Sequence, residues 1–468
     1  MSSIADTIWE IDDYLWYIPF VLIIALGLYS TIRFKGIQFT KLKEMFRITF
    51  SKTKGEKNES GITPFHVFCV SMGNRVGIGN IAGPVTAILT GGPGAIFWMW
   101  VFAALGGATS FVESTIGQLF KSRGHDGISK GGPAYNISKG LQWKKLGVVV
   151  AFLMILMYIV GYISSEVTAI SEAFCGAFQF ENNSLILAIV MTVIAGIVAV
   201  GGFKGVAKAS AYIVPFMALG WFALCIVVIV MNFSNLGNAF AMIFGYAFNP
   251  PAFVGGLAGS LIVGMRRGIW SNEAGIGTIT NVSSMADVDH PAQQGLSQSL
   301  GVLFDTIICT LTAFVVLTFG GFDATIQITD DSMPYLQSIF EGAIGSIAPT
   351  LVFIFIFLFA ITCFMGDFVI GENNLRFITE SKKAKIGIIV LVMVVVFISC
   401  FWASDTAFAV LDVLLAICGV INCIVIFKLF NRAVEVYKDY REQKSKGIEE
   451  PKFHKDALSD DTGVTEWD

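Results

Sequence analysis

Long apolar runs make up most of this chain, and short polar stretches separate them. A helix needs about 20 apolar residues to cross the hydrocarbon of a bilayer. Runs of this length lie at residues 14–34, 64–91, 94–120, 146–176, 184–203, 208–232, 252–284, 293–320, 347–376, 385–403 and 406–430. We therefore expect an all-α polytopic membrane protein with 11 transmembrane helices, one for each of these runs.

Composition agrees with this interpretation. The chain has 468 residues, of which 54% are hydrophobic and 14% are charged, whereas about 25% of the residues in a soluble protein are charged. The 48 glycines suit close packing of helices in lipid. The basic residues do not gather on one amphipathic face, so we expect membrane lipid and a small substrate as partners, and no nucleic acid.

The sequence lacks the common motifs of enzymes. It has no Walker A motif, no HExxH motif and no nucleophile elbow. None of its 8 cysteines forms a CxxC pair, and we interpret them as small buried apolar residues. We therefore expect a protein that is not an enzyme and does not use ATP as its energy source.

Basic residues alternate regularly between the loops. Lys and Arg accumulate in cytoplasmic loops, and here they fill residues 33–57, 121–145 and 428–455. The intervening loops contain neither residue type, at 1–13, 177–183, 233–251, 321–346 and 404–405. This pattern predicts a multi-pass protein of the cell (plasma or inner) membrane, with its N-terminus outside and its C-terminus in the cytoplasm.

The two ends of the chain are polar. The first residues are acidic (Asp6, Glu10, Asp12 and Asp13), whereas a cleavable signal peptide starts with basic residues. The segment after about residue 431 is charged, and we expect it to be a partly disordered cytoplasmic tail.

Two of the apolar runs contain clusters of glycine and polar residues. The first reads Gly73-Asn74-Arg75-Val76-Gly77-Ile78-Gly79-Asn80, and the second reads Arg266-Arg267-Gly268-Ile269-Trp270-Ser271-Asn272-Glu273-Ala274-Gly275-Ile276-Gly277. Each glycine destabilises a helix by about 1 kcal/mol relative to alanine. We therefore predict that helices 2 and 7 are broken at these places. The alternative is that the glycines only allow close helix packing.

A broken helix inside a membrane favours a ligand site, because unpaired backbone groups in hydrocarbon are costly unless they face a cavity or a ligand. The freed carbonyls can coordinate a cation, and the exposed helix N-terminus can hold a carboxylate. The two breaks lie five crossings apart, so their helices run in opposite directions. This predicts two inverted five-helix repeats, at residues 61–232 and 233–430, after an extra N-terminal helix and linker (1–60) and before the tail (431–468).

The motifs around the breaks resemble those of the alanine/glycine:cation symporter family. Val76-Gly77-Ile78-Gly79-Asn80-Ile81-Ala82-Gly83 matches the family's VG-x-GNIAG signature, and the second break, the Gly91–Trp100 stretch and His290-Pro291 also look like the family. The resemblance implies a fold similar to LeuT-type transporters and uptake of alanine, glycine or sometimes glutamine with sodium. The chain departs from the family at Ile78, at Tyr158–Val167 and at Thr362-Cys363, where the family has more polar or hydroxyl residues.

From the breaks and the resemblance together we expect a sodium-coupled symporter of small neutral amino acids that works by alternating access. The expected substrate site consists of Gly77, Ile78, Gly79, Trp270, Ser271, Asn272, Glu273 and Gly275. The expected site for the co-transported Na⁺ consists of Gly73, Val76, Asn80, Thr362 and Cys363. The sequence leaves open whether alanine, glycine or glutamine is preferred, and it leaves a proton as the alternative coupling ion and an ion channel as the alternative class.

Several polar residues have two interpretations. Asn80 either caps a helix or gives its side-chain oxygen to a cation. Glu273 either contacts substrate or forms a structural pair with Arg267, Arg75 or free amides. Arg75 is expected to pair with Glu113, Glu273 or Asp305. We interpret the run Phe353–Phe364 as mainly lipid-facing.

Overall fold

The computed structural model describes residues 15–50, 62–124, 127–178, 185–249, 256–320, 322, 332–401 and 404–468. The acidic residues Asp6, Glu10, Asp12 and Asp13, which distinguish the start of the chain from a basic signal peptide, lie outside these ranges. The described chain is built almost entirely from helices, and its two short strands form one antiparallel pair, β1 (Ser122–Arg123) with β2 (Ser129–Lys130). The expected all-α class is confirmed.

The first half of the chain contains the following helices in order: α2 (Tyr17–Arg33), α3 (Ile37–Thr40), α4 (Leu42–Phe50), α5 (Pro64–Arg75), α6 (Ile78–Gly91), α7 (Gly94–Leu119), α8 (Pro133–Tyr135), η1 (Asn136–Gly140), α9 (Lys144–Ile155), η2 (Leu156–Tyr162), α10 (Ile163–Phe178) and α11 (Leu185–Met231). The second half contains η3 (Phe233–Asn235), α12 (Leu236–Phe248), α13 (Gly256–Asn272), α14 (Ile279–Ser283), α15 (Pro291–Val315), η5 (Val316–Gly320), α16 (Ser332–Ile344), α17 (Ala348–Ile378), α18 (Lys382–Ser399), α19 (Ser404–Ser445) and η6 (Lys455–Ala457).

Within the described residues, 6 helices are long and apolar enough to cross a membrane, at 94–119, 144–178, 185–231, 291–320, 348–378 and 408–445. They cover seven of the apolar runs, because α11 spans two of them. The helix α11 bends at Gly202, whose φ of 59° lies in the left-handed region that glycine adopts readily. A multi-pass membrane protein is therefore confirmed.

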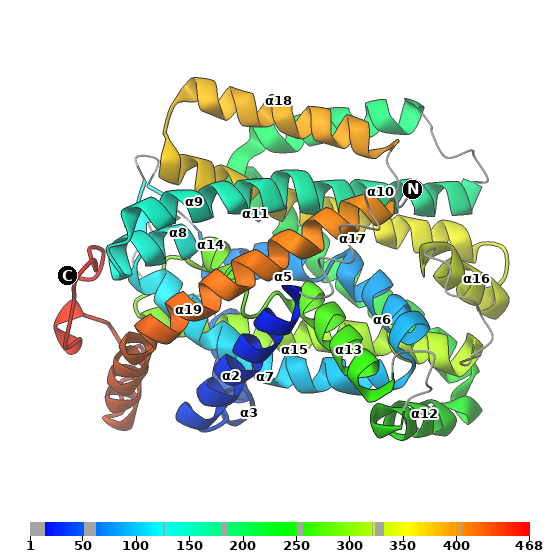
Figure 1. The fold of residues 1–468 in the computed structure, drawn as a ribbon, viewed down its shortest axis with the longest axis horizontal. Helices are drawn as coiled ribbons and strands as arrows, with labels where there is room; N and C mark the ends of the chain where they lie inside the picture. Colours follow the sequence, from blue (N-terminus) through cyan, green and yellow to red (C-terminus); the bar gives the residue numbers. More distant parts are fainter. Residues whose placement is uncertain are drawn as a thin grey trace.

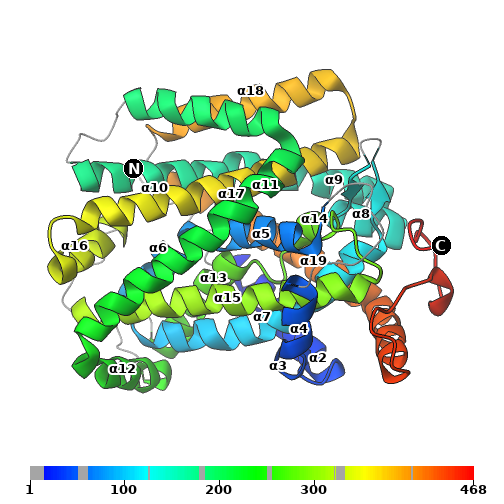
Figure 2. The same cartoon turned by 180° about the vertical axis from the view of Figure 1, so that it is seen from behind.

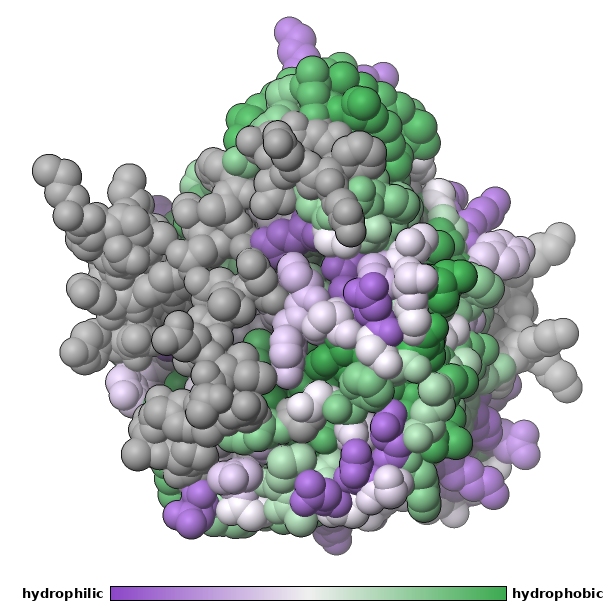
Figure 3. Space-filling model, turned by 90° about the vertical axis from the view of Figure 1, so that its right-hand side faces the viewer, coloured by the Kyte–Doolittle hydropathy of each residue, from purple (hydrophilic) through white to green (hydrophobic). Residues whose placement is uncertain are grey.

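The helices form a bundle in which distant parts of the sequence lie side by side (Figure 1). The N-terminal half of α11 packs along α18 at one edge of the bundle, and α7 packs along α15 nearer the opposite edge, as both cartoon views show (Figure 2). The C-terminal segment lies at one end of the bundle, whereas α12 and α16 lie at the other end. Seen from the end with α12 and α16, hydrophilic residues gather near the middle and hydrophobic residues cover the upper edge (Figure 3).

The expectation of a partly disordered tail is wrong. The helix α19 continues to Ser445, and the following segment folds back onto the bundle. Trp467 is buried and donates from Nε1 to the carbonyl of Gln118 (3.0 Å), and the amide of Phe453 donates to the carbonyl of Asp289 (2.9 Å). A few apolar residues thus anchor a segment that is otherwise highly charged.

The run Phe353–Phe364 is only partly directed away from the protein. Phe359 and Phe364 are buried, whereas Phe353, Phe355 and Phe357 are half-buried. Phe359 packs against the ring of Trp221 with a centroid distance of 6.1 Å. One face of this helix therefore belongs to the core.

Candidate functional site

The first break separates α5 from α6 at two residues, Val76 and Gly77. Thr63 caps the start of α5, and Pro64 follows at the first helical position, where a proline needs no amide partner. Gly77 is extended (φ −125°, ψ −150°), and its amide donates to Oδ1 of Asn80 at 3.0 Å. The predicted break is confirmed, and the oxygen of Asn80 caps α6.

The second break follows the end of α13 at Asn272. Three residues after it have positive φ, namely Glu273 (55°), Gly275 (98°) and Gly277 (85°). Positive φ is uncommon for a non-glycine residue and costs of the order of 1–3 kcal/mol. The Asn272 side chain stabilises the turn, because its Oδ1 accepts from the amide of Ala274 at 2.9 Å. This predicted break is also confirmed.

The two breaks lie directly against each other. A Cβ atom built on Gly79 would lie 3.3 Å from Cα of Ser271 and 3.6 Å from the carbonyl oxygen of Trp270. Four residues further along α6, a Cβ on Gly83 would meet the Trp270 ring at 3.8 Å. Glycine at both positions therefore allows close packing of α6 on α13, so the packing interpretation accounts for Gly79.

A single carboxylate links the two broken helices. Oδ1 of Asp305 on α15 accepts from Nδ2 of Asn80 (2.6 Å) and from the hydroxyl of Ser271 (2.7 Å). The thiol of Cys309, one turn further along α15, lies within 3.3 Å of Asn80 Nδ2 and 3.1 Å of the Ser271 hydroxyl. All of these side chains are buried. The polar atoms of both breaks thus meet at α15.

Glu273 is bound by neutral donors and not by Arg75. Its carboxylate accepts from Nδ2 of Asn74 (3.2 Å), the hydroxyl of Tyr158 (3.3 Å) and the hydroxyl of Thr278 (2.9 Å). Tyr158 belongs to the π-helical segment η2, which interrupts the regular pattern between α9 and α10. Such π-helical segments are frequent at functional sites.

Arg75 is buried, and the three carboxylates expected as its possible partners, Asp305, Glu273 and Glu113, interact with it electrostatically, but its hydrogen bonds go to neutral groups. Its guanidinium donates to the carbonyl of Gln298 (2.8 Å) and to the hydroxyl of Ser110 (2.8 Å). Within the described residues it forms no ion pair with Glu113, Glu273 or Asp305. Arg75 therefore fixes α5 to α7 and α15 through neutral groups.

Glu113 instead supports the second break from α7. One of its oxygens accepts from the amide of Gly275 (3.2 Å), and the other accepts from the side-chain amide of Asn422 on α19. Asn422 also donates to the carbonyl of Gly275 (2.9 Å). The side chains of Glu113 and Asn422 thus fix the backbone of Gly275 within the second break.

Gly73, Thr362 and Cys363 of the expected cation site lie together on α5 and α17, whereas Asn80 lies on α6 and bonds to Asp305. A Cβ on Gly73 would meet Thr362 at 3.3 Å, and the Cys363 thiol donates to the carbonyls of Gly73 (3.0 Å) and Asn74 (3.3 Å). The Thr362 hydroxyl donates to the carbonyl of Phe359 in its own helix (2.9 Å). Val76 is the residue that directly follows the last residue of α5.

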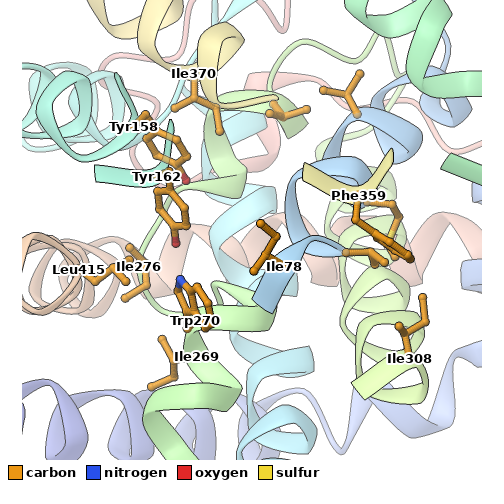
Figure 4. Packing of buried hydrophobic residues seen from close by; sticks show 14 of the residues in the cluster. Ile78, Tyr158, Tyr162, Ile269, Trp270, Ile276, Ile308, Phe359, Ile370 and Leu415 are labelled. Atoms are coloured by element: carbon orange, nitrogen blue, oxygen red, sulfur yellow. The ribbon is translucent and has the colours of Figure 1, made fainter. Parts of the chain in front are cut away.

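Apolar side chains surround the breaks (Figure 4). Ile78 and Trp270 are buried, and the rings of Tyr158 and Tyr162 stack at 4.9 Å on the neighbouring segment η2. A cavity of about 10 Å³ lies between α7, α13 and α15, and its lining includes Met99, Trp100, Ser271, Asn272, Asp305 and Cys309. A cavity of this size holds about one water molecule.

Sequence reasoning missed part of this cluster. Asn74, Tyr158, Glu166, Asp367 and Asn422 are buried polar residues around the breaks that had no assigned role. Each lies in an apolar run, where polar and ionisable residues mark functional positions. That signal was available in the sequence, but it did not indicate which residues would meet.

Two broken helices that pack together inside a polytopic helical bundle are typical of a secondary transporter. The chain belongs to the sodium:alanine symporter family, whose profile matches residues 1–455. It is therefore a membrane transporter, and the resemblance in the sequence motifs is confirmed.

Curated relatives cover nearly the whole chain. The amino-acid carrier protein AlsT of Bacillus subtilis is 39% identical over 448 residues, covering 94% of this chain and 92% of the relative. The probable sodium/glutamine symporter GlnT of the same organism is 36% identical, covering 97% and 94%. A sodium/proton-dependent alanine carrier protein of Bacillus sp. PS3 is 30% identical, covering 89% and 97%.

Proposed function

We propose that this protein is a sodium-coupled symporter of a small neutral amino acid, alanine or glycine, and that it works by alternating access. The observation that carries this proposal is the junction of the two breaks, where Gly79 packs on Ser271 and Asp305 binds both helices. Helix ends that meet at one buried place offer amides to a carboxylate and carbonyls to a cation. An amino acid and Na⁺ are ligands of those two kinds.

The pairing of helices supports two inverted repeats of five helices. If residues 61–232 and 233–430 are equivalent repeats, the two broken helices correspond to each other. The further corresponding pairs are α7 with α15, α10 with α17, and the first arm of α11 with α18. Within each pair the two members pack against each other: α6 on α13, α7 on α15, α10 on α17 and α11 on α18. Self-packing of equivalent elements is expected around a pseudo-two-fold axis. With α2 as the extra helix, this arrangement makes 11 crossings.

The substrate is proposed to bind between the breaks. Its carboxylate would meet the amides of Ile78 and Gly79 at the start of α6, where the helix dipole favours negative charge. Asn272 and Ser271 would provide polar contacts, and Trp270 and Ile78 would limit the size of the side chain. The cavity of about 10 Å³ that Ser271 and Asn272 line with α7 and α15 is smaller than an amino acid, so this cavity would have to open for substrate to enter it.

The coupling ion is proposed to be Na⁺, bound near Gly73, Val76, Thr362 and Cys363. Backbone carbonyls freed at the end of α5 are hard oxygen ligands, and a hard cation prefers oxygen. Two relatives are named sodium/proton-dependent alanine carriers, so a proton is the alternative ion. The name of GlnT makes glutamine the alternative substrate.

The proposed orientation has the C-terminus in the cytoplasm. The folded C-terminal segment and the basic loop at 121–145 lie at the same end of the bundle, and α12 and α16 lie at the opposite end (Figure 1). Cytoplasmic loops carry the excess of Lys and Arg. This arrangement fits a protein of the cell membrane with its N-terminus outside.

Uptake of radiolabelled amino acids into proteoliposomes tests the proposal. With an inward sodium gradient, alanine or glycine should accumulate, and an excess of the unlabelled amino acid should compete. Uptake that does not saturate with substrate would favour the channel alternative, and accumulation of glutamine alone would replace the proposed substrate.

A further inference from the structure

Two carboxylates beside the first break have oxygens without any partner. Glu166 on α10 and Asp367 on α17 are 4% and 1% exposed. Within the described chain, Oε2 of Glu166, Oδ2 of Asp367 and Oδ1 of Asn74 are buried and accept no hydrogen bond. A buried polar atom without a partner costs roughly 1–3 kcal/mol, and a buried charge costs more. Three such atoms from three helices therefore point to a missing ligand.

Glu166 lies beside Gly77 and Cys363, Asn74 packs on Gly366, and Asp367 interacts electrostatically with Cys363. A Cβ on Gly77 would overlap Sγ of Cys363 and come within 3.7 Å of Oε1 of Glu166. A Cβ on Gly366, the residue before Asp367, would overlap Oδ1 of Asn74. The carboxylates of Glu166 and Asp367 are close enough to interact electrostatically with each other and with Glu273.

In the described part of the chain, no cationic side chain is paired with these two carboxylates. Among the described residues, neither Glu166 nor Asp367 forms an ion pair within 4 Å, and Arg75 is directed to Gln298 and Ser110. The other titratable groups that face the pair are Cys363 on α17, Tyr158 and Tyr162 on η2, and Glu273 after α13. The pair therefore stays uncharged only with bound protons, and a bound cation would compensate its charge when it is ionised.

We propose that Glu166 and Asp367, together with Asn74, form an acidic site for Na⁺ on the α10–α17 side of the first break. The carbonyls of Gly73 and Asn74 would complete a set of five oxygen ligands. Those carbonyls accept from the thiol of Cys363, which is a weak donor that a cation can displace. The inference rests on the proposed function, because it identifies the charged ligands of the coupling ion.

The ligand set favours a hard cation over a transition metal. In the part of the chain that the structure describes, no three His, Cys, Asp or Glu residues are arranged to hold a metal ion. Two carboxylates completed by amide and carbonyl oxygens form an all-oxygen site, which suits hard cations. Na⁺ is the hard monovalent ion that the proposed function supplies.

The test is direct binding of ²²Na⁺ to the purified full-length protein, with Glu166→Gln and Asp367→Asn as variants and Glu341→Gln, an exposed residue of α16, as the matched control. Each site variant should weaken sodium binding by at least about tenfold, because the number of charged ligands sets cation affinity. The control should bind as the wild type does. Cys363→Ser replaces sulfur by oxygen and should strengthen sodium binding, a gain that a misfolded protein would not produce.

Three results would overturn the inference. Unchanged sodium binding in both acidic variants, with loss of amino-acid binding, would assign the carboxylates to the substrate's ammonium group. Unchanged sodium binding with loss of uptake driven by a proton gradient would make them proton carriers. Weaker sodium binding in Cys363→Ser would contradict the proposed geometry. A fourth result would separate the site from the proposed function. If sodium binding depends on Asp367 but the protein transports no amino acid, the proposed function is rejected and the sodium site is supported.

Discussion

The side-chain amide nitrogen of Asn80 on α6 lies 2.6 Å from Oδ1 of Asp305 on α15. The same oxygen accepts from Ser271 on α13, so one buried carboxylate holds both broken helices. In a transporter that alternates between two states, such a link either persists as a fixed support or breaks in each cycle. Both possibilities make Asp305 essential for the geometry of the site.

Replacing Asp305 by Asn tests this link. The amide has only one acceptor oxygen and brings its own donors against Asn80 and Ser271, which leaves a buried group unsatisfied. We expect destabilisation by about 1–3 kcal/mol, seen as a lower midpoint of thermal unfolding in detergent. Asp289→Asn, at an exposed position before α15, is the control. An unchanged midpoint and unchanged uptake in Asp305→Asn would show that the link has no role.

Gly79→Ala tests the close approach of the breaks. The new Cβ would lie 3.3 Å from Cα of Ser271, and backbone cannot rotate away as a flexible side chain can. We expect weaker amino-acid binding, measured by equilibrium binding of labelled substrate. Gly237→Ala, where nothing lies within 4 Å, should bind normally and gain up to about 1 kcal/mol of stability, since alanine is the better helix former. Equal binding by the two variants would contradict the account.

Asn272→Ala should abolish substrate binding and leave the protein folded. Because Oδ1 of Asn272 also accepts from the amide of Ala274 (2.9 Å), a loss of binding has two explanations. Asn272→Asp separates them, since it keeps the acceptor for the turn, removes the amide donors and adds a carboxylate that would repel the carboxylate of the substrate. We expect both variants to lose substrate affinity. Recovery of wild-type affinity in Asn272→Asp would limit Asn272 to a structural role.

The orientation in the membrane is tested by introducing one cysteine at a time into a protein from which Cys175 has been removed, since the other seven native cysteines are buried. Ser234, between α11 and α12, should react with an impermeant reagent from outside, and Lys446, after α19, only from inside. Both positions are exposed. Labelling of both from one side of the membrane would reject the proposed topology.

Lys121, which packs on the C-terminal segment, makes the stability of the folded protein depend on pH. Lys121 donates to Oε1 of Gln118 (2.9 Å) and lies 4.4 Å from the centre of the Trp467 ring. Burial lowers the pKa of the Lys121 ammonium to about 8, and the charges of Asp287 and Glu466 oppose this shift. In the unfolded chain the pKa is about 10.4, so the unfolded state binds more protons between pH 8 and 10.

It follows that the contribution of Lys121 to stability improves as the pH rises from about 8 to about 10, by up to roughly 3 kcal/mol. Thermal unfolding of the wild type and of Lys121→Met across this range isolates the effect, because the other groups titrate in both proteins. The difference between the two midpoints should change in favour of the wild type as the pH increases. A constant difference would contradict the lowered pKa.

The sequence predicted the parts of the fold that depend on local composition. Glycine beside asparagine disfavours a regular helix, and both breaks were found within one or two residues of Val76 and Asn272. The partners of Arg75 were not predictable in this way, because Gln298 and Ser110 belong to distant helices. The tail is ordered because single residues such as Trp467 are buried against the bundle. The average composition of the tail does not reveal this burial.

The acidic pair shows the same limit at the site. Glu166 and Asp367 each stand in an apolar run, but about 200 residues separate them, and packing of α10 on α17 brings their helices together. The exchange of a hydroxyl residue for Cys363 was visible in the sequence. That the thiol would occupy the carbonyls of Gly73 and Asn74 required the structure.

The central claim is coupling of amino-acid transport to sodium, and uptake into proteoliposomes under imposed gradients measures it most directly. Labelled alanine should accumulate above its external concentration with an inward sodium gradient at equal pH on both sides. It should only equilibrate when sodium is equal on both sides, and an inward proton gradient without sodium should not replace the sodium gradient. Accumulation that ignores sodium and follows the proton gradient would contradict the account.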